Sequence, residues 1–214
     1  MPLLGLDGCF TKGYHIRQLL TAIGVDGNNQ LYLIAYALVE AETKDICGWF
    51  LEQLTDDLEL NNSFSIVWIS DKHKGLLDVT VERFPHSEYM FCVKHPYNNF
   101  KAQHRGLLLK QILWAAGKST IEQEFNQWMK KMKTESPPAY NWLVGKGAKH
   151  WPRAFFKDTT LCDMLCNNMC EAFNVAILAA RDKPIITMME MIRNYLMTRL
   201  VRKMAGLEKW SHEN

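Results

Sequence analysis

Residues 64–71 read FSIVWISD, a nearly unbroken apolar run that ends in Ser70 and Asp71. A run of this kind is typical of a strand that is buried on both faces, as in a central parallel position of a sheet. Three more strands are expected upstream, at residues 3–10, 17–25 and 31–40. The turn-forming sequence DGNN precedes the third of them, so we expect the first three strands to form an antiparallel meander.

The apolar period changes on either side of the 64–71 run. Residues 45–59 carry apolar side chains at spacings of three and four, which predicts an amphipathic helix. Residues 75–84 read as a second helix and residues 88–93 as a fifth strand. The order strand-strand-strand-helix-strand-helix-strand predicts an α/β protein, in which helices flank a mixed five-stranded sheet.

Between residues 97 and 160 the strand pattern is absent, and we expect an all-helical insertion there. A capping box, Ser119-Thr120-Ile121-Glu122, would begin one of its helices, and Pro137-Pro138 would end that helix. Beyond the insertion we expect a break at Lys183-Pro184. The helices expected are at residues 107–116, 119–133, 140–144 and 185–204.

The segment 161–181 reads LCDMLCNNMCEAFNVAILAAR and predicts one more helix, with Glu171 near its middle. At helical spacing Asn167, Asn168 and Asn174 lie on the same side as Glu171. The segment therefore presents an acid among amides. The simpler alternative is a polar face in contact with solvent.

The composition fits one globular domain, with 214 residues of which 48% are hydrophobic and 22% charged. A formal net charge of +2 provides no strong basic field, so binding of nucleic acid would need local patches. The N-terminus lacks a signal-peptide pattern, and no apolar run approaches the roughly 18 residues of a membrane span. We expect a soluble intracellular protein, and a fragment, because the chain begins almost inside its first strand.

Six cysteines in a chain of this length do not indicate a disulfide scaffold. Cys162, Cys166 and Cys170 recur at every fourth residue and would line one side of a helix, which favours reduced, packed thiols. Cys92 and His95 form a C-x-x-H motif at the end of the fifth strand. A structural zinc site needs four ligands and no second pair stands out, so a packed cysteine and a hydrogen-bonded histidine are the alternative.

Two acids occupy positions where strands end. Asp7 interrupts the first apolar run, and Asp71 follows the fourth strand directly. A buried carboxylate needs a partner, and sites in open sheets gather at the carboxyl ends of strands. Together with Glu171, these acids could hold two divalent cations, and oxygen ligands suit Mg²⁺ or Mn²⁺. The alternatives are a turn or edge position for Asp7 and a helix cap for Asp71.

Basic residues accompany these motifs and could form a modest phosphate-contacting surface, with aromatic residues among them. Lys72, His73 and Lys74 follow Asp71. The others are Lys94, Lys101, His104, Arg105 and Lys110, with Tyr97 and Phe100 between them. A charged face in contact with solvent is again the alternative.

Several long stretches resemble the transposase domain of Mutator-like elements from plants, the MuDR-type MULE transposase family. They are LDGCFTKG, SDKHKGL, FCVKHPYNNF and CDMLCNNMCEAFNVAIL. The resemblance implies a ribonuclease H-like fold with a helical insertion, residues 97–160, before the last catalytic acid. It also implies that the family's Asp-Asp-Glu triad corresponds to Asp7, Asp71 and Glu171, and its C-x-x-H motif to Cys92 and His95.

This resemblance implies a nuclear protein that cuts DNA at transposon ends and joins the 3′-hydroxyl to target DNA, with Mg²⁺ or Mn²⁺ held by the triad. The implied partners are terminal inverted repeats, target DNA and further copies of the chain, with no membrane. The residues expected to contact DNA or support the site are Cys92, His95, Lys72, Lys74, Lys94, Asn167 and Asn168.

Two other functions stay open. One is a catalytically inactive, transposase-derived protein that binds DNA or regulates transcription. The other is a zinc module centred on Cys92 and His95.

Overall fold

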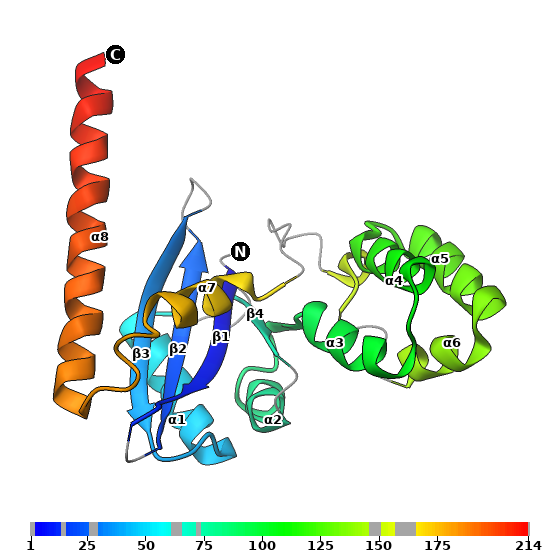
Figure 1. Ribbon diagram of the computed structural model, residues 1–214, viewed down its shortest axis with the longest axis horizontal. Helices are drawn as coiled ribbons and strands as arrows, with labels where there is room; N and C mark the ends of the chain where they lie inside the picture. The colour runs from blue at the N-terminus through cyan, green and yellow to red at the C-terminus, as the bar shows by residue number, and fades with distance from the viewer. Residues whose placement is uncertain are drawn as a thin grey trace.

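The computed structural model describes residues 3–13, 16–25, 30–60, 66–71, 74–145, 151–156 and 166–213, and for residues 74, 75, 77, 95 and 206–213 it describes the backbone alone. The elements of this part of the chain surround one mixed sheet (Figure 1). No helix within it is both long and apolar enough to cross a membrane.

The sheet has five strands in the order β3-β2-β1-β4-β5. They are β1 (Leu3–Phe10), β2 (Gln18–Val25), β3 (Leu31–Val39), β4 (Val67–Ser70) and β5 (Glu88–Phe91). The first three form an antiparallel meander, and β4 and β5 continue the sheet parallel to β1. The predicted α/β class and five-stranded mixed sheet are therefore confirmed.

The apolar run that ends at Asp71 forms β4, between two parallel neighbours. All four of its residues are buried, and the Trp68 side chain is fully enclosed. Burial on both faces explains why this strand has no polar alternation.

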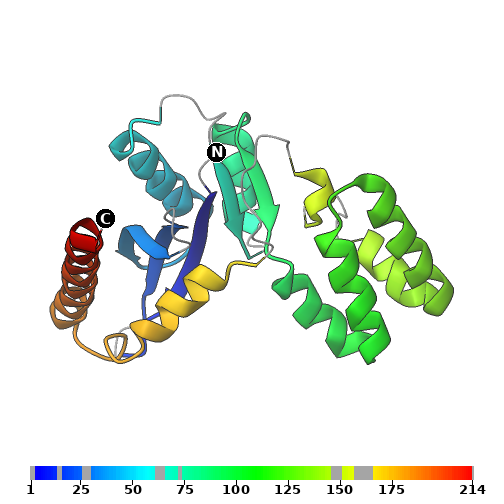
Figure 2. The ribbon, with the colours of Figure 1, turned by 90° about the horizontal axis from the view of Figure 1, so that it is seen from above.

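Helices cover both faces of the sheet, and residues of β1 point alternately to one side and the other. Leu4 and Leu6 belong to the core under α1 (Lys44–Asp57) and α2 (Lys74–Arg83). Leu3 and Cys9 belong to the core under α7 (Asn168–Ala176) and the first half of α8 (Ile185–Glu213). Figure 2 shows α1 and α7 on opposite sides of the strands.

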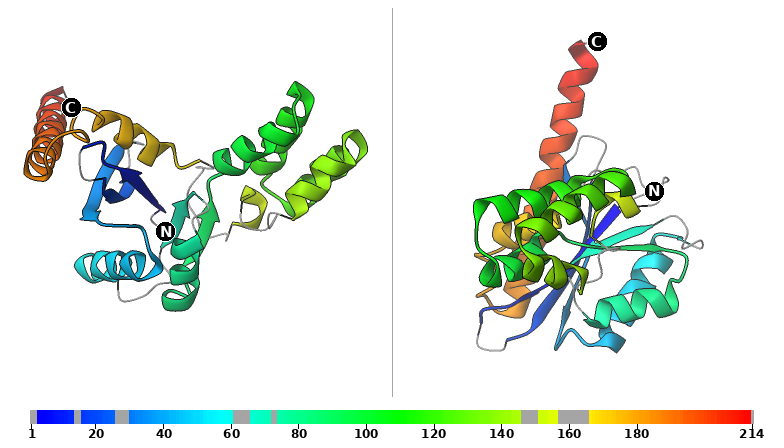
Figure 3. Two further views of the ribbon diagram at one scale, coloured as in Figure 1. Left: turned by 60° about the horizontal axis from the view of Figure 1, so that its bottom comes forward. Right: turned by 90° about the vertical axis from the view of Figure 1, so that its right-hand side faces the viewer.

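A helical region lies between β5 and α7 in the sequence and beside the β5 edge of the sheet, on the side away from α8 (Figures 1 and 3). Buried aromatic and aliphatic side chains, among them Phe100, Ile112, Phe125 and Trp151, join its helices into the core that continues under the sheet. Its elements are α3 (Lys94–Gln103), α4 (Leu107–Lys118), α5 (Glu122–Glu135), α6 (Pro137–Val144) and the short 3₁₀ helix η2 (Arg153–Phe155).

Helix α3 was not predicted from the sequence. Its residues, KHPYNNFKAQ, are mostly polar and include Pro96, so no amphipathic pattern marks the helix. Proline is tolerated in the first turn of a helix, where its missing N–H is not needed, and Pro96 lies in that turn. Phe100 then anchors the helix in the core.

The predicted capping box at Ser119–Glu122 is wrong. Ile121 precedes α5 and makes no side-chain cap. Ser119 is buried at the end of α4, where its hydroxyl donates to the carbonyl of Ala115. Ser119 therefore ends one helix instead of starting the next.

Pro137 and Pro138 end α5 as predicted, but they also begin α6, three residues earlier than expected. Ser136 is the N-cap, and its hydroxyl accepts the amide of Ala139 at 3.4 Å. Proline suits this position because its fixed φ is already helical.

The helix predicted at residues 161–181 is much shorter in the structure. Residues 161–165 lie outside the described part, Cys166 and Asn167 precede α7, and turns follow Ala176. Asn167 leaves the helical conformation because its amides bind the sheet: its N–H donates to Cys92 Sγ at 3.2 Å, and its Nδ2 donates to the carbonyl of Leu6 at 2.9 Å. Cys166 therefore does not share a helix face with Cys170, and Cys162 lies outside the described residues.

Replacing Gly5 should loosen α7 from the sheet. A Cβ on Gly5 would lie 2.5 Å from Asn167 Oδ1 and 2.9 Å from Met169 Sδ, closer than real contacts allow. Because Asn167 is bound to the sheet, we expect Gly5→Ala to lower the free energy of unfolding by about 1–3 kcal/mol. Denaturant unfolding measures this loss.

Gly13→Ala is the matched control, since its Cβ would meet the Asp182 carbonyl oxygen at an ordinary 3.6 Å. Equal stability of the two variants would contradict this account of how α7 docks.

Candidate functional site

Asp7 and Asp71 lie side by side where the parallel pairing of β1 with β4 ends, although Asp7 itself is inside β1 and not at a strand end as expected. Leu6 of β1 pairs with Ser70 of β4 in parallel. The residue that follows each of them along the chain is an acid, Asp7 after Leu6 and Asp71 after Ser70. Asp7 is in a strand flanked on both sides, and Asp71 is half-buried directly after its strand. The adjacency expected from the sequence is therefore present.

The Asp7 carboxylate faces α7 and is held by two hydrogen bonds. Its Oδ1 accepts the amide of Gly8 at 3.0 Å, and its Oδ2 accepts Nδ2 of Asn174 at 2.7 Å. Burial, with the negative charge of Asp71 and a smaller effect of Glu42, nevertheless raises the pKa of Asp7 to about 7. The site thus holds a carboxyl group that changes charge near neutral pH.

Glu171 is in the first turn of α7, where it forms an ion pair with Lys94 at the start of α3. The hydrogen bond that Lys94 donates to Glu171 raises the pKa of the lysine. The two side chains are 47% and 40% exposed, so solvent screens this pair and it contributes little to stability. The pair matters because it sets the direction of the Glu171 side chain, which points toward the ammonium group of Lys94.

The three asparagines predicted to accompany Glu171 have different positions. Asn167 is buried and binds the sheet, Asn174 binds Asp7, and Asn168 is exposed. Within the described residues, the Oδ1 atoms of Asn167 and Asn174 are buried without a hydrogen-bond partner. Buried acceptors of this kind are uncommon and often mark a place where a further donor or cation binds.

Cys92 is buried at the end of β5 and lies against Cys166. The hydrogen bond with Cys166, together with burial, raises the pKa of the Cys92 thiol, so it is protonated at neutral pH. Its sulfur also accepts the amide of Asn167, and Cys92 thereby ties β5 to the start of α7. His95 lies in α3, and its side chain is outside the described residues.

The basic residues divide into two groups. Lys72 and His73 lie outside the described residues, as does the side chain of Lys74. In the second group Lys94 pairs with Glu171, and the others surround one pocket between α3 and α4. The residues that line this pocket are Tyr97, Phe100, Lys101, Ala102, His104, Arg105, Gly106, Leu107 and Lys110.

Glu42 is a further acid near the site that was not predicted from the sequence. It follows β3, and its Oε2 would lie 2.6 Å from a Cβ placed on Gly8. The signal that would have found it is the one that found Asp71, an acid just beyond the end of a strand.

Asp7 and Asp71 provide the oxygen ligands that a divalent cation needs. Within the described part of the chain, no three His, Cys, Asp or Glu side chains are close enough to hold a metal ion. The desolvated carboxylate of Asp7 beside a second acid fits a cation, since a positive charge would offset both the burial and the repulsion. Glu171 can join them only after it leaves Lys94.

These features define an α/β protein with an acidic pair where two parallel strands stop pairing, and a third acid on a helix that packs on the same sheet. Residues 3–99 match the family model of the MULE transposase domain. The match includes Asp7, Asp71, Cys92 and His95, ends within α3, and does not reach Glu171. It supports the relationship to MULE transposases that the sequence motifs indicate. A search of curated proteins found no match.

The raised pKa of Asp7 predicts how stability depends on pH. The carboxyl has a pKa of about 7 in the folded protein and an ordinary value of 3.8, so the folded state holds a proton that the unfolded state releases between these values. The contribution of Asp7 to stability is therefore complete below about pH 4 and is lost as the pH rises through 7. Each unit of this difference corresponds to about 1.4 kcal/mol.

Asp7→Asn should remove this dependence, because the amide carries no charge and its Nδ2 can donate to the partnerless Oδ1 of Asn174. In metal-free buffer we expect the variant to be more stable than the wild type by about 2–4 kcal/mol at pH 8, and little different at pH 4. Denaturant unfolding at both pH values measures this difference in stability. Asp56→Asn is the control, because Asp56 is an exposed aspartate of α1. If the stability difference between Asp7→Asn and the wild type is the same at both pH values, the raised pKa of Asp7 is contradicted.

Proposed function

We propose that the chain is a catalytic domain of a MULE-type DNA transposase with a ribonuclease H-like fold. The observation that carries the proposal is the adjacency of Asp7 and Asp71 inside the segment that matches the MULE transposase domain. The strand order β3-β2-β1-β4-β5, with β4 and β5 parallel to β1, supports the fold assignment. The helices between β5 and α7 correspond to the insertion expected at residues 97–160.

In this proposal Asp7 of β1 and Asp71, just after β4, would hold a divalent cation, Mg²⁺ or Mn²⁺. The bound metal supplies a Lewis acid and lowers the pKa of a coordinated water or hydroxyl. Asn174 orients the Asp7 carboxylate through the 2.7 Å hydrogen bond. Glu171 completes the ligand set when Lys94 turns to another anion, and a DNA phosphate is such an anion.

The proposed substrates are transposon terminal inverted repeats and target DNA, in the nucleus, with further copies of the chain as protein partners. The plant MuDR-type subgroup is part of the same proposal and is supported by the motifs around Asp7, Asp71 and Glu171.

A second candidate is a transposase-derived protein that binds DNA or regulates transcription without cutting. One observation favours it: Glu171 is neutralised by Lys94 and does not meet the two aspartates. If this pair persists on DNA, the third acid never becomes a metal ligand.

Mn²⁺-dependent nicking or strand transfer on DNA that carries candidate terminal repeats tests the first candidate. We expect Asp71→Asn and Glu171→Gln each to reduce the rate at least about 100-fold, because each removes a charge that acts on the reacting phosphate. The matched control for Glu171 is Glu190→Gln, an exposed glutamate in α8 that is likewise paired with a cation, Arg193. Wild-type rates in both acid variants would refute the catalytic proposal.

Lys94→Gln separates the two candidates by a measurement of metal binding. If Glu171 is a ligand that Lys94 withholds, Lys94→Gln should strengthen Mn²⁺ binding severalfold in calorimetry, and adding Glu171→Gln should abolish the gain. Unchanged Mn²⁺ affinity in Lys94→Gln, with no nicking by the wild type, would favour the non-catalytic candidate.

A further inference from the structure

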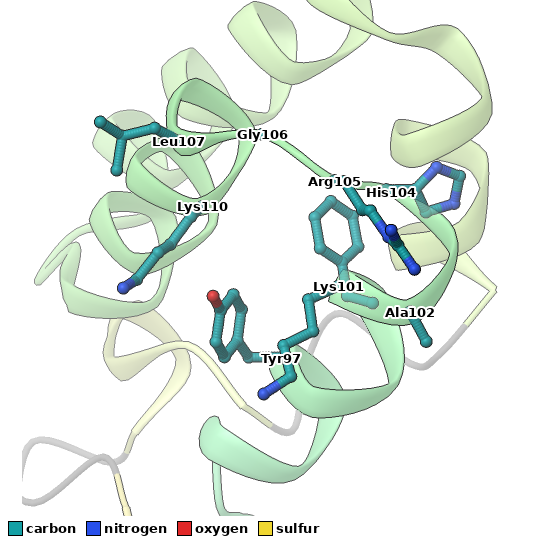
Figure 4. Close-up of a pocket in the computed structure, with 9 residues that line it drawn as sticks. Tyr97, Lys101, Ala102, His104, Arg105, Gly106, Leu107 and Lys110 are labelled. Atoms are coloured by element: carbon teal, nitrogen blue, oxygen red, sulfur yellow. The ribbon is translucent and has the colours of Figure 1, made fainter.

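A pocket between α3 and α4 is not used by the proposed catalytic centre. Its volume is about 560 Å³, within the range of ligand-binding sites. Figure 4 shows Tyr97 and Lys101 on one side of the opening and Leu107 and Lys110 on the other. Phe100, which is fully buried, and His104, stacked against it with ring centroids 5.0 Å apart, form an aromatic wall.

The charge of the pocket has one sign. Lys101, Arg105 and Lys110 line it together with His104, and among the described residues no aspartate or glutamate lines it. In the sequence no aspartate or glutamate occurs between Glu88 and Glu122. The chain as a whole has a formal charge of only +2, so this pocket is a local concentration of positive charge.

Two lysines from different helices converge on one aromatic ring. The ammonium of Lys101 lies 5.6 Å from the centroid of the Tyr97 ring, and that of Lys110 lies 5.8 Å from it. Across the described residues neither lysine has an ion pair, whereas Lys44 and Lys94 each pair with a glutamate. Two like charges that share one ring repel each other, and an anion between them relieves this repulsion.

The first turn of α4 adds further donors on the same side. Gly106 precedes this helix with φ 135°, a conformation suited to glycine, and no side chain caps the helix. Gly106 and Leu107 both line the pocket, so the N-terminal end of the 12-residue helix faces it. The partial positive charge of a helix N-terminus adds to that of the three basic side chains.

Helix α3 connects this pocket to the acidic site. Lys94, which holds Glu171, is three residues before Tyr97 and seven before Lys101, so the three share one face of the helix. Seven residues of helix rise about 10 Å. A DNA strand advances about 3.4 Å per nucleotide in a duplex, so the pocket is within a few nucleotides of Glu171.

We propose that the α3–α4 pocket binds an unpaired nucleotide of the DNA strand close to the cleavage site. The base stacks against Tyr97, and Lys101, Arg105 and Lys110 hold the adjacent phosphates. A flat aromatic ring among three cations fits a nucleotide better than a bare phosphate, because a nucleotide supplies both a π-face and negative charge. This inference rests on the proposed function, since it assigns part of the same DNA substrate.

The test is binding of fluorescent oligo-dT at low salt with EDTA, so that the result does not depend on the acids or a metal. We expect Tyr97→Leu to weaken binding roughly 5- to 100-fold and Tyr97→Phe to restore it, because stacking needs only the ring. Lys101→Gln and Lys110→Gln should each weaken binding about threefold or more and reduce the salt dependence by about one ion. Lys131→Gln is the matched control, since Lys131 lies 5.3 Å from the Trp128 ring on α5, outside the pocket.

Oligo-dT with 2-aminopurine at one position adds a direct readout, because stacking quenches its fluorescence. Quenching in the wild type and Tyr97→Phe, but not in Tyr97→Leu, supports the proposal. Wild-type affinity in Tyr97→Leu would overturn it, as would equal losses in Lys101→Gln and Lys131→Gln, or equally effective competition by polyglutamate. Absence of oligo-dT binding by the wild type would overturn it too.

Asp71→Asn distinguishes this inference from the proposed catalytic function. The variant should bind oligo-dT like the wild type while losing nicking. If neither the wild type nor any variant nicks DNA, while oligo-dT binding still depends on Tyr97, the catalytic proposal is refuted and the assignment of the pocket is supported.

Discussion

The arrangement of the site depends on a buried carboxylate, that of Asp7, in the middle strand of the sheet. Removing this group from water is unfavourable, and the surrounding structure provides only partial compensation through Gly8 and Asn174. Asn174 can reach it because α7 lies close to β1, and α7 lies close because Gly5 has no side chain where Asn167 inserts. The position of Glu171, in the first turn of α7, follows from the same docking.

Most of the sheet could be predicted from the sequence because its strands are apolar runs separated by strong turn signals. The burial of β4 on both faces and the adjacency of Asp7 and Asp71 both followed from that pattern. Helix α3 was missed because its local sequence is polar and contains Pro96, while its stability comes from Phe100 in the core.

The third acid shows where prediction from the sequence ends. Spacing placed Glu171 and three asparagines on one side of a long helix, but Asn167 leaves that helix to bind Cys92 and Leu6. The direction of the Glu171 side chain is then decided by Lys94, 77 residues earlier in the chain. Local periodicity contains no information on a contact between segments so far apart, and the rotamer of an exposed glutamate depends on such contacts.

In helix α8, the buried apolar contacts that the structure describes come from the first half. Met188 and Ile192 are buried and Tyr195 and Leu196 pack against the sheet, whereas Val201 and Met204 are more than 60% exposed. At about 1.5 Å per residue, the 29 residues of α8 extend about 44 Å. Starting a helix is the unfavourable step in water, and here the folded sheet provides that start. The outer turns therefore extend a helix whose first turns are already formed against the sheet, so their helicity depends on the integrity of the sheet at the other end of the helix.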